Sequence, residues 1–359
     1  MKRLICLAVF LLLLTGHARA AELPKDLTDA MPEAAAELLE DTDVSGADGF
    51  SNGIGKLLER VSGQVGTVLR QRVRGAASVL LVVVLCGAVD GFYQGAGGGK
   101  AAWFLPMAGA LSITLLTAGS LDSLLGLGKQ TIGDLSAFSK VLLPVLAAVT
   151  AAAGGVGTAT VQQVTTVFLV DLLVNLIHGL LLPLVYLYIG ALAASAALPE
   201  NRLSALAEGL KKIITWVLTT SLLLFTVYLS IARVITGAAD AASVKVAKAA
   251  ISGVVPVVGG IISEAAETVL AGAGMLKNTV GIFGTLAILA ACAYPFLQLG
   301  IQYLLYKLTA FLAAAAGAPQ LCKLIDGLGG AFGLVLGMTG SCALLLLISV
   351  LSSVAAVVP

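Results

Sequence analysis

The chain has 359 residues, of which 11% are charged and 58% are hydrophobic, and its formal net charge is +1. A soluble domain carries charge on roughly 25% of its residues, so this composition excludes a soluble globular protein and indicates several membrane-spanning helices. The near-zero net charge gives no reason to expect a nucleic-acid partner. We therefore predict an all-α fold, a polytopic transmembrane helical bundle with amphipathic interfacial helices.

The first 20 residues have the pattern of a secretory signal peptide. A basic start, an apolar run at 4–14 and small residues before Ala20 predict cleavage after that residue; an uncleaved first span is the alternative. Residues 21–75 then form an acidic segment followed by a basic amphipathic helix. That helix either lies on the membrane surface or packs against its neighbours.

Residues 76–359 are predicted to form the multi-span transmembrane domain, because a bilayer core of about 30 Å needs about 20 apolar residues in a helix. Pro183 lies near the middle of the longest apolar stretch and predicts a kink, a break or two spans. Residues 121–140 mix charged and apolar side chains and are predicted to be interfacial. Spans are expected near residues 76–93, 101–120, 141–161, 164–198, 213–236, 280–306 and 331–358, with an amphipathic hairpin at 240–278.

Asp171, Asn175 and His178 form a polar stripe within one of these spans, because they fall at i, i+4 and i+7 of a helix. Such a stripe is typical of a cation or proton path, in which His178 would titrate near neutral pH. Alternatively, it packs against polar residues of another helix and holds the bundle together. Gln298 and Gln302, one helical turn apart, are candidate partners for the stripe.

The sequence predicts no enzyme, no cofactor and no metal site. Once the signal peptide is removed, His178 is the only histidine, and no nucleophile–histidine–acid set remains. The cysteines are scattered among apolar runs without a C-x-x-C pair, so we interpret them as packing residues.

The stretch between residues 233 and 307 carries the most distinctive pattern of the chain. Two lysines precede a Pro/Gly turn, and two glutamates, a further lysine and an asparagine follow it: Lys245, Lys248, Pro256, Gly259, Gly260, Glu264, Glu267, Lys277 and Asn278. This pattern, with the layout of the whole chain, resembles the AE family of stage III sporulation proteins of endospore-forming bacteria.

The resemblance implies a role and no reaction. Members of this family are multi-pass proteins of the mother-cell membrane around the forespore. They act with other stage III sporulation membrane proteins and a forespore-side partner in a secretion-like channel complex required for late forespore development. A structural or channel-forming component is therefore expected, self-association into a homo-oligomer is left open, and a secondary transporter or permease for a small solute in the same membrane is the alternative.

The residues themselves allow two interpretations of the 240–278 hairpin. If the segment folds back at Pro256, the lysine pair and the glutamate pair can meet as ion pairs. The hairpin then either lines or gates a pore, or it lies on the membrane surface and docks a partner.

Overall fold

The computed structural model describes residues 24–39, 49–95, 104–198, 202–254, 259–316 and 319–355, and the side chains of residues 232–273 also lie outside the described set. The described residues are helical except for short turns and contain no strand, which confirms the all-α fold class. The elements are α2 (Lys25–Asp29), α3 (Glu33–Leu39), α4 (Gly49–Gly95), α5 (Phe104–Ala152), α6 (Val156–Leu176), the π-helical turn η2 (Ile177–Leu181), α7 (Leu182–Ala197), α8 (Arg202–Val254), α9 (Gly259–Ala315) and α10 (Pro319–Ala355). The predicted signal peptide at residues 1–20 lies outside the described residues.

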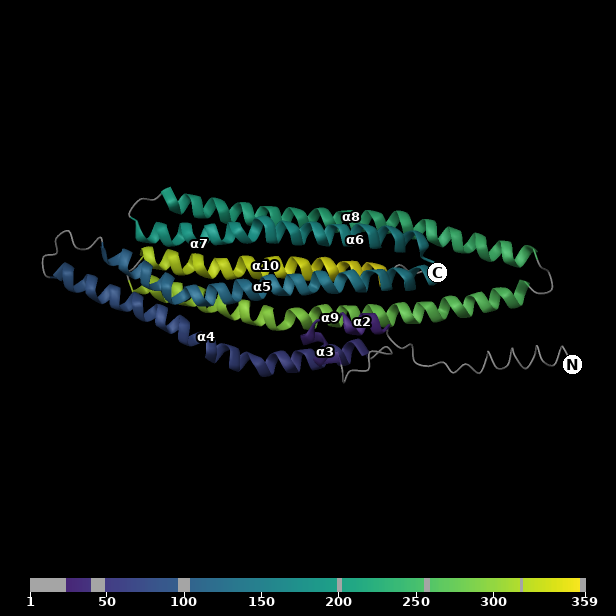
Figure 1. Cartoon of the computed structure of the whole chain (residues 1–359), viewed down its shortest axis with the longest axis horizontal. Helices are drawn as coiled ribbons and strands as arrows, with labels where there is room; N and C mark the ends of the chain where they lie inside the picture. The colour runs from purple at the N-terminus through teal and green to yellow at the C-terminus, as the bar shows by residue number, and fades with distance from the viewer. Residues whose placement is uncertain are drawn as a thin grey trace.

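The long helices run side by side in an elongated bundle, with α10 in its middle, the short α3 against α9 and the short α2 against α5 (Figure 1). In the described part of the chain, six helices are long and apolar enough to cross a membrane, in keeping with the predicted transmembrane bundle. Helices α4, α5, α8 and α9 have 47, 49, 53 and 57 residues. At about 1.5 Å per residue they are about 70–85 Å long, more than twice the hydrocarbon thickness, so they extend beyond the bilayer core.

Helix α5 differs from the prediction for its part of the chain. Residues 121–140 are the continuous middle of α5, so their assignment to a separate interfacial segment is wrong. Their apolar side chains recur at helical spacing, and Leu124, Ile132 and Phe138 are fully buried in the bundle. The described residues of the predicted span 101–120 and the first part of the predicted span 141–161 therefore belong to one helix. A turn at residues 153–155 interrupts the predicted span 141–161. Gly154 makes that turn with a φ of 94°, a conformation that glycine adopts without strain.

The apolar stretch 164–198 is one helical run that contains a π-helical turn. The turn η2 ends two residues before Pro183, which lacks an N–H group and crowds the carbonyl one turn earlier. Widening of the helix at η2 accommodates the proline without a loop, as π-turns do. Of the three predicted outcomes, the structure shows a local distortion and no division into two helices.

The first half of α4 contains the predicted basic amphipathic helix. Its apolar face packs on α9: Val68 is 3% exposed, and a Cβ at Gly53 would overlap the side chain of Leu286. This face of α4 therefore packs against a neighbouring helix, which was one of the two predicted arrangements. Leu58, Val65 and Leu69 lie on other sides of the helix and stay exposed.

Close contact between α5 and α10 requires a glycine. A Cβ at Gly128 would overlap Cγ1 of Val335, whereas a Cβ at Gly126 would meet no atom within 4 Å. We expect Gly128→Ala to lower the free energy of unfolding by about 1–3 kcal/mol through overpacking. Gly126→Ala, two residues away, should instead raise it by up to about 1 kcal/mol, because alanine is the better helix former. Unfolding of both variants in mixed detergent micelles tests this, and equal effects would contradict the close contact.

Candidate functional site

Polar side chains on α9 form a row that begins at the exposed Tyr294 and continues into the bundle interior. Tyr294, Gln298, Gln302 and Tyr306 follow one another at four-residue spacing and therefore share one side of the helix. Gln298, Gln302 and Tyr306 are only 4%, 2% and 2% exposed. We call these four residues the α9 polar row. Buried amides at this depth need hydrogen-bond partners, because hydrocarbon supplies none.

Arg72 of α4 supplies one of these partners. Its Nε donates to Oε1 of Gln298 at 3.1 Å, and its Nη2 donates to the same oxygen. Nε2 of Gln298 donates in turn to Oη of Tyr294. The charged guanidinium of Arg72 thus donates to a neutral amide. This charge-assisted hydrogen bond joins α4 to α9.

Further along the α9 polar row, one polar atom is left without a protein partner. Oε1 of Gln302 is buried and accepts no hydrogen bond within the described residues. Tyr306 instead packs its ring edge-on against Phe332 of α10, with centroids 5.3 Å apart. A buried acceptor of this kind is usually satisfied by an ordered water molecule.

Beyond Tyr306, an ion pair joins α9 to α10. Nζ of Lys307 lies 2.5 Å from Oδ1 of Asp326 and 5.8 Å from the centroid of the Tyr303 ring. One residue after Asp326, the carbonyl of Gly327 accepts a hydrogen bond from Oη of Tyr188 on α7, at 3.0 Å. These contacts tie three helices together at one level of the bundle.

The predicted stripe of α6 and η2 is divided among different surroundings. Asp171 forms an ion pair with Lys140 of α5, at 3.2 Å, and Asn175 is exposed on the outside. His178 lies in the π-turn, where its Nε2 is buried without a partner among the described residues. Gln298 and Gln302 do not contact this stripe through any described hydrogen bond, since Gln298 binds Arg72 and Tyr294. Whether the stripe conducts ions stays a prediction.

Part of the predicted 240–278 hairpin lies outside the described residues. This applies to residues 255–258, with Pro256 among them, and to the side chains of Lys245, Lys248, Glu264 and Glu267; the backbone at these four positions and at Gly259 and Gly260 belongs to α8 and α9. Lys277 is described; it belongs to α9 and is 5% exposed. The gating and docking interpretations of the hairpin both stay predictions.

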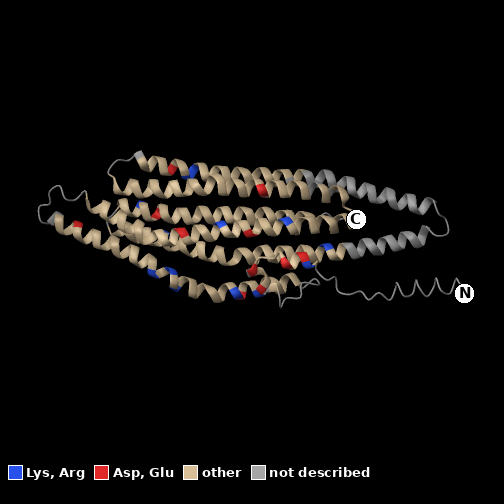
Figure 2. Cartoon of the chain, in the orientation of Figure 1, with Lys and Arg blue, Asp and Glu red and all other residues tan. Residues whose placement is uncertain are grey.

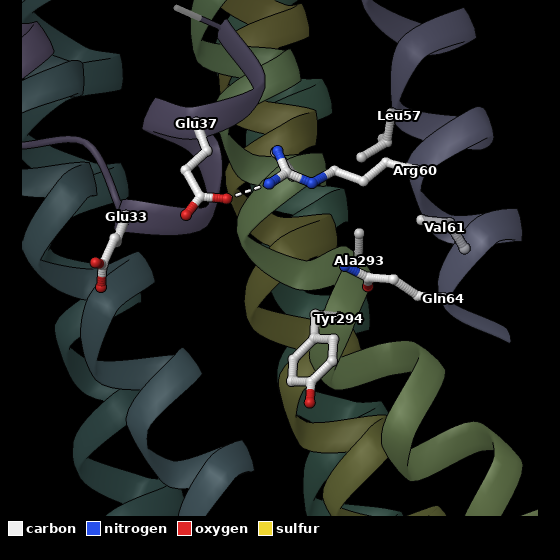
Figure 3. A pocket seen from close by; sticks show the side chains of 9 residues that line it. Glu33, Glu37, Leu57, Arg60, Val61, Gln64, Ala293 and Tyr294 are labelled. Atoms are coloured by element: carbon white, nitrogen blue, oxygen red, sulfur yellow. Dashed lines mark hydrogen bonds and ion pairs between the residues drawn. The ribbon is translucent and has the colours of Figure 1, made fainter. Parts of the chain in front are cut away.

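A cavity of about 390 Å³ opens between α3, α4 and α9. Figure 3 shows that Glu33 and Glu37 come from α3, that Leu57, Arg60 and Gln64 come from α4, and that Tyr294 closes one side. Glu37 and Arg60 form an ion pair that holds α3 against α4. Because Tyr294 also belongs to the α9 polar row, the cavity adjoins the hydrogen bonds around Arg72. No group of three potential metal ligands occurs in the part of the chain that the structure describes.

Sequence reasoning missed Arg72 and Asp326 as contributors to the bundle interior. Arginines at positions 70, 72 and 74 all contribute to the positive charge of the predicted basic amphipathic helix. At 3.6 residues per turn, however, Arg72 points about 160° away from Arg70 and Arg74, and this angle was the available signal. The signal for Asp326 was its place at the start of a long charge-free run.

Together, the bundle and its contacts define a polytopic α-helical membrane protein whose interior polar groups join one helix to another. Comparison with known families assigns it further: the chain belongs to the stage III sporulation protein AE family, whose model matches residues 46–357. This confirms the resemblance drawn from the sequence.

A curated relative is similar along part of the chain. It is the stage III sporulation protein AE of Bacillus subtilis (strain 168), 25% identical over 214 residues. The match covers 60% of this chain and 54% of the relative, so the chain spans about half the length of the curated relative that it matches. No solved structure matches the chain. The protein is thus a multi-pass membrane protein of a sporulation family.

Proposed function

We propose that the chain is a structural, channel-associated component of a membrane complex that joins the mother cell and the forespore and is needed for late forespore development. It acts in the mother-cell membrane around the forespore, with other stage III sporulation membrane proteins and a forespore-side partner. The family match and the name of the relative support a sporulation role. The proposal assigns no enzymatic activity to the chain.

The observation that carries this proposal is the way in which interior polar groups are used. The Arg72–Gln298 and Lys307–Asp326 contacts each join two helices. Polar contacts of this kind fix neighbouring helices relative to one another. A transporter needs the opposite, helices that separate around a central site during each cycle. Helices about twice as long as the bilayer core is thick also offer surface outside the membrane to partner proteins.

One observation favours the alternative, a secondary transporter for a small solute. His178 places a buried, unpartnered Nε2 on a π-helical turn, and π-turns often mark functional sites. An imidazole at membrane depth is also a frequent element of proton paths.

Sporulating cells that carry variant genes distinguish the two functions. For a structural component we expect Asp171→Asn and His178→Ala to leave the number of heat-resistant spores unchanged, because neither change breaks a buried contact between helices. A structural protein should instead fail when the α9–α10 contact is disturbed, for example by Gly281→Leu, whose side chain would overlap Val354. Loss of spores in the His178→Ala strain, with normal protein levels and normal co-purification of the other stage III proteins, would favour the transporter.

A further inference from the structure

The outward face of α4 changes from basic to apolar along one straight stripe. Arg70 and Arg74 are about 40° apart around the helix axis and both are exposed. The same side continues with exposed apolar residues, of which Leu81, Leu85 and Phe92 are 59%, 56% and 81% exposed. Figure 2 shows the same change: basic residues occur on α4 up to its middle, and its C-terminal part is almost free of charge. Within the described residues, neither arginine has an ion-pair partner.

The helices next to α4 are also apolar where they run beside the apolar part of this stripe, which contains Leu81, Leu85 and Phe92. A Cβ at Gly109 would lie 2.9 Å from Sγ of Cys86, so residues 104–121 of α5, which contain no charge, run beside residues 75–89 of α4. A Cβ at Gly87 would lie 3.1 Å from the carbonyl oxygen of Ala316, at the end of α9. The outward residues there are also large and apolar: Leu111, Leu115, Leu116, Leu304, Leu308 and Phe311. Together these surfaces form a band that fits hydrocarbon.

Arg70 and Arg74 stand at the edge of this band, where the headgroups of a bilayer would lie. Two guanidinium groups one turn apart suit a phosphate group, which arginine binds through paired hydrogen bonds. Basic residues next to a membrane span attract anionic lipids. We propose that Arg70 and Arg74 bind the phosphate of an anionic phospholipid whose acyl chains lie along Leu81 and Leu85, which are within about 17 Å of Arg74 along the helix. The site is independent of the proposed role in the sporulation complex.

The chain provides a charge-matched control for this site. Arg60 and Arg72 lie on the same helix, but they are occupied by Glu37 and by Gln298. The double variant Arg60→Gln, Arg72→Gln therefore removes the same charge from α4 as Arg70→Gln, Arg74→Gln does, and leaves the outward pair intact. Because Arg70 and Arg74 are exposed, their replacement is not expected to disturb folding.

The test titrates purified, delipidated full-length protein in a mild detergent with fluorescent phosphatidylglycerol, with phosphatidylcholine and inorganic phosphate as comparison probes. We expect phosphatidylglycerol to bind more tightly than phosphatidylcholine, and added salt to weaken binding. Arg70→Gln, Arg74→Gln should weaken phosphatidylglycerol binding by about thirty-fold, the effect of two arginines near a lipid surface. Arg60→Gln, Arg72→Gln should change it by less than about three-fold.

Three results would overturn the proposal. Equal losses in the two double variants, with the unfolding midpoints showing that both are folded under the conditions of the titration, would mean that the effect follows net charge and not a site. Displacement of the lipid by inorganic phosphate at equal concentration would indicate a site for free anions. Unchanged lipid binding by Arg70→Gln, Arg74→Gln, together with loss of a co-purified protein from sporulating cells, would assign this face of α4 to a protein partner.

Discussion

Asp326→Leu is expected to lower the free energy of unfolding by about 3 kcal/mol, because it leaves the ammonium group of Lys307 without its carboxylate partner. In the absence of lipid, 32% of the Lys307 side chain and 49% of the Asp326 side chain are exposed. An ion pair so exposed to water would contribute at most about 1 kcal/mol. Lys307, however, is followed on α9 by the outward-facing Leu308 and Phe311, whose apolar side chains indicate that hydrocarbon, and not water, covers this side of the pair.

A double-mutant cycle distinguishes a desolvated ion pair, worth about 3 kcal/mol, from a water-exposed pair, worth at most about 1 kcal/mol. We expect Lys307→Met, Asp326→Leu to be close to the wild type in stability, since replacing both members of a desolvated pair removes the stranded charge. The coupling energy between the two positions should then be at least about 2 kcal/mol, measured by unfolding in mixed micelles. The Arg60–Glu37 pair is the control, because it bounds an open cavity and should couple by less than about 1 kcal/mol. Equal coupling in the two pairs would show that water reaches Lys307.

Arg72→Leu is expected to have the second largest effect, a loss of about 1–3 kcal/mol in the free energy of unfolding. The substitution removes both donors from Oε1 of Gln298, a side chain that is only 4% exposed, and leaves that oxygen without a partner in an apolar interior. Removing the partly buried guanidinium charge offsets part of this loss. Arg70→Leu, two residues away and exposed, should change stability by no more than about 0.5 kcal/mol.

Adding Gln298→Leu to Arg72→Leu is expected to restore the stability that Arg72→Leu alone removes. Arg72→Leu, Gln298→Leu leaves neither the guanidinium nor the amide unpaired, and Tyr294, which loses its contact with Gln298, is 41% exposed and can bind water instead. The stability of the double variant should therefore match or exceed that of the wild type. Unfolding midpoints of the two single variants and the double variant, in the same micelles, measure the effect. A double variant as unstable as the sum of the single variants would mean that Arg72 acts through contacts other than Gln298.

The sequence was sufficient for the fold class and for most of the long helices. Low charge and apolar runs longer than a bilayer predicted a helical membrane bundle, and the pattern around Pro256 predicted the family that the comparison confirmed. Helix bounds were harder to predict. Residues 121–140 carry Asp122, Lys129 and Asp134, which suggested a surface segment, yet these exposed charges lie around α5 away from the side that carries its buried apolar residues.

The partners of interior polar residues could not be predicted from local spacing. The sequence shows that Gln298 and Gln302 share a side of one helix, but it does not show that α4 runs beside that side. The actual partner, Arg72, is separated from Gln298 by 226 positions in the chain. The same limit applies to Asp171, whose partner Lys140 belongs to the preceding long helix and had been assigned to an interfacial segment.

We propose that interior polar contacts hold the helices in place and do not form a transport path. The most direct measurement is the yield of heat-resistant spores from cells carrying Arg72→Leu, Gln298→Leu or Lys307→Met, Asp326→Leu, compared with cells carrying the single variants. We expect normal spore numbers for the double variants, because they keep the bundle intact without these polar groups. The single variants should give reduced numbers. Loss of spores in double variants that are stable and present at normal levels would contradict this proposal, because the polar groups themselves would then be required.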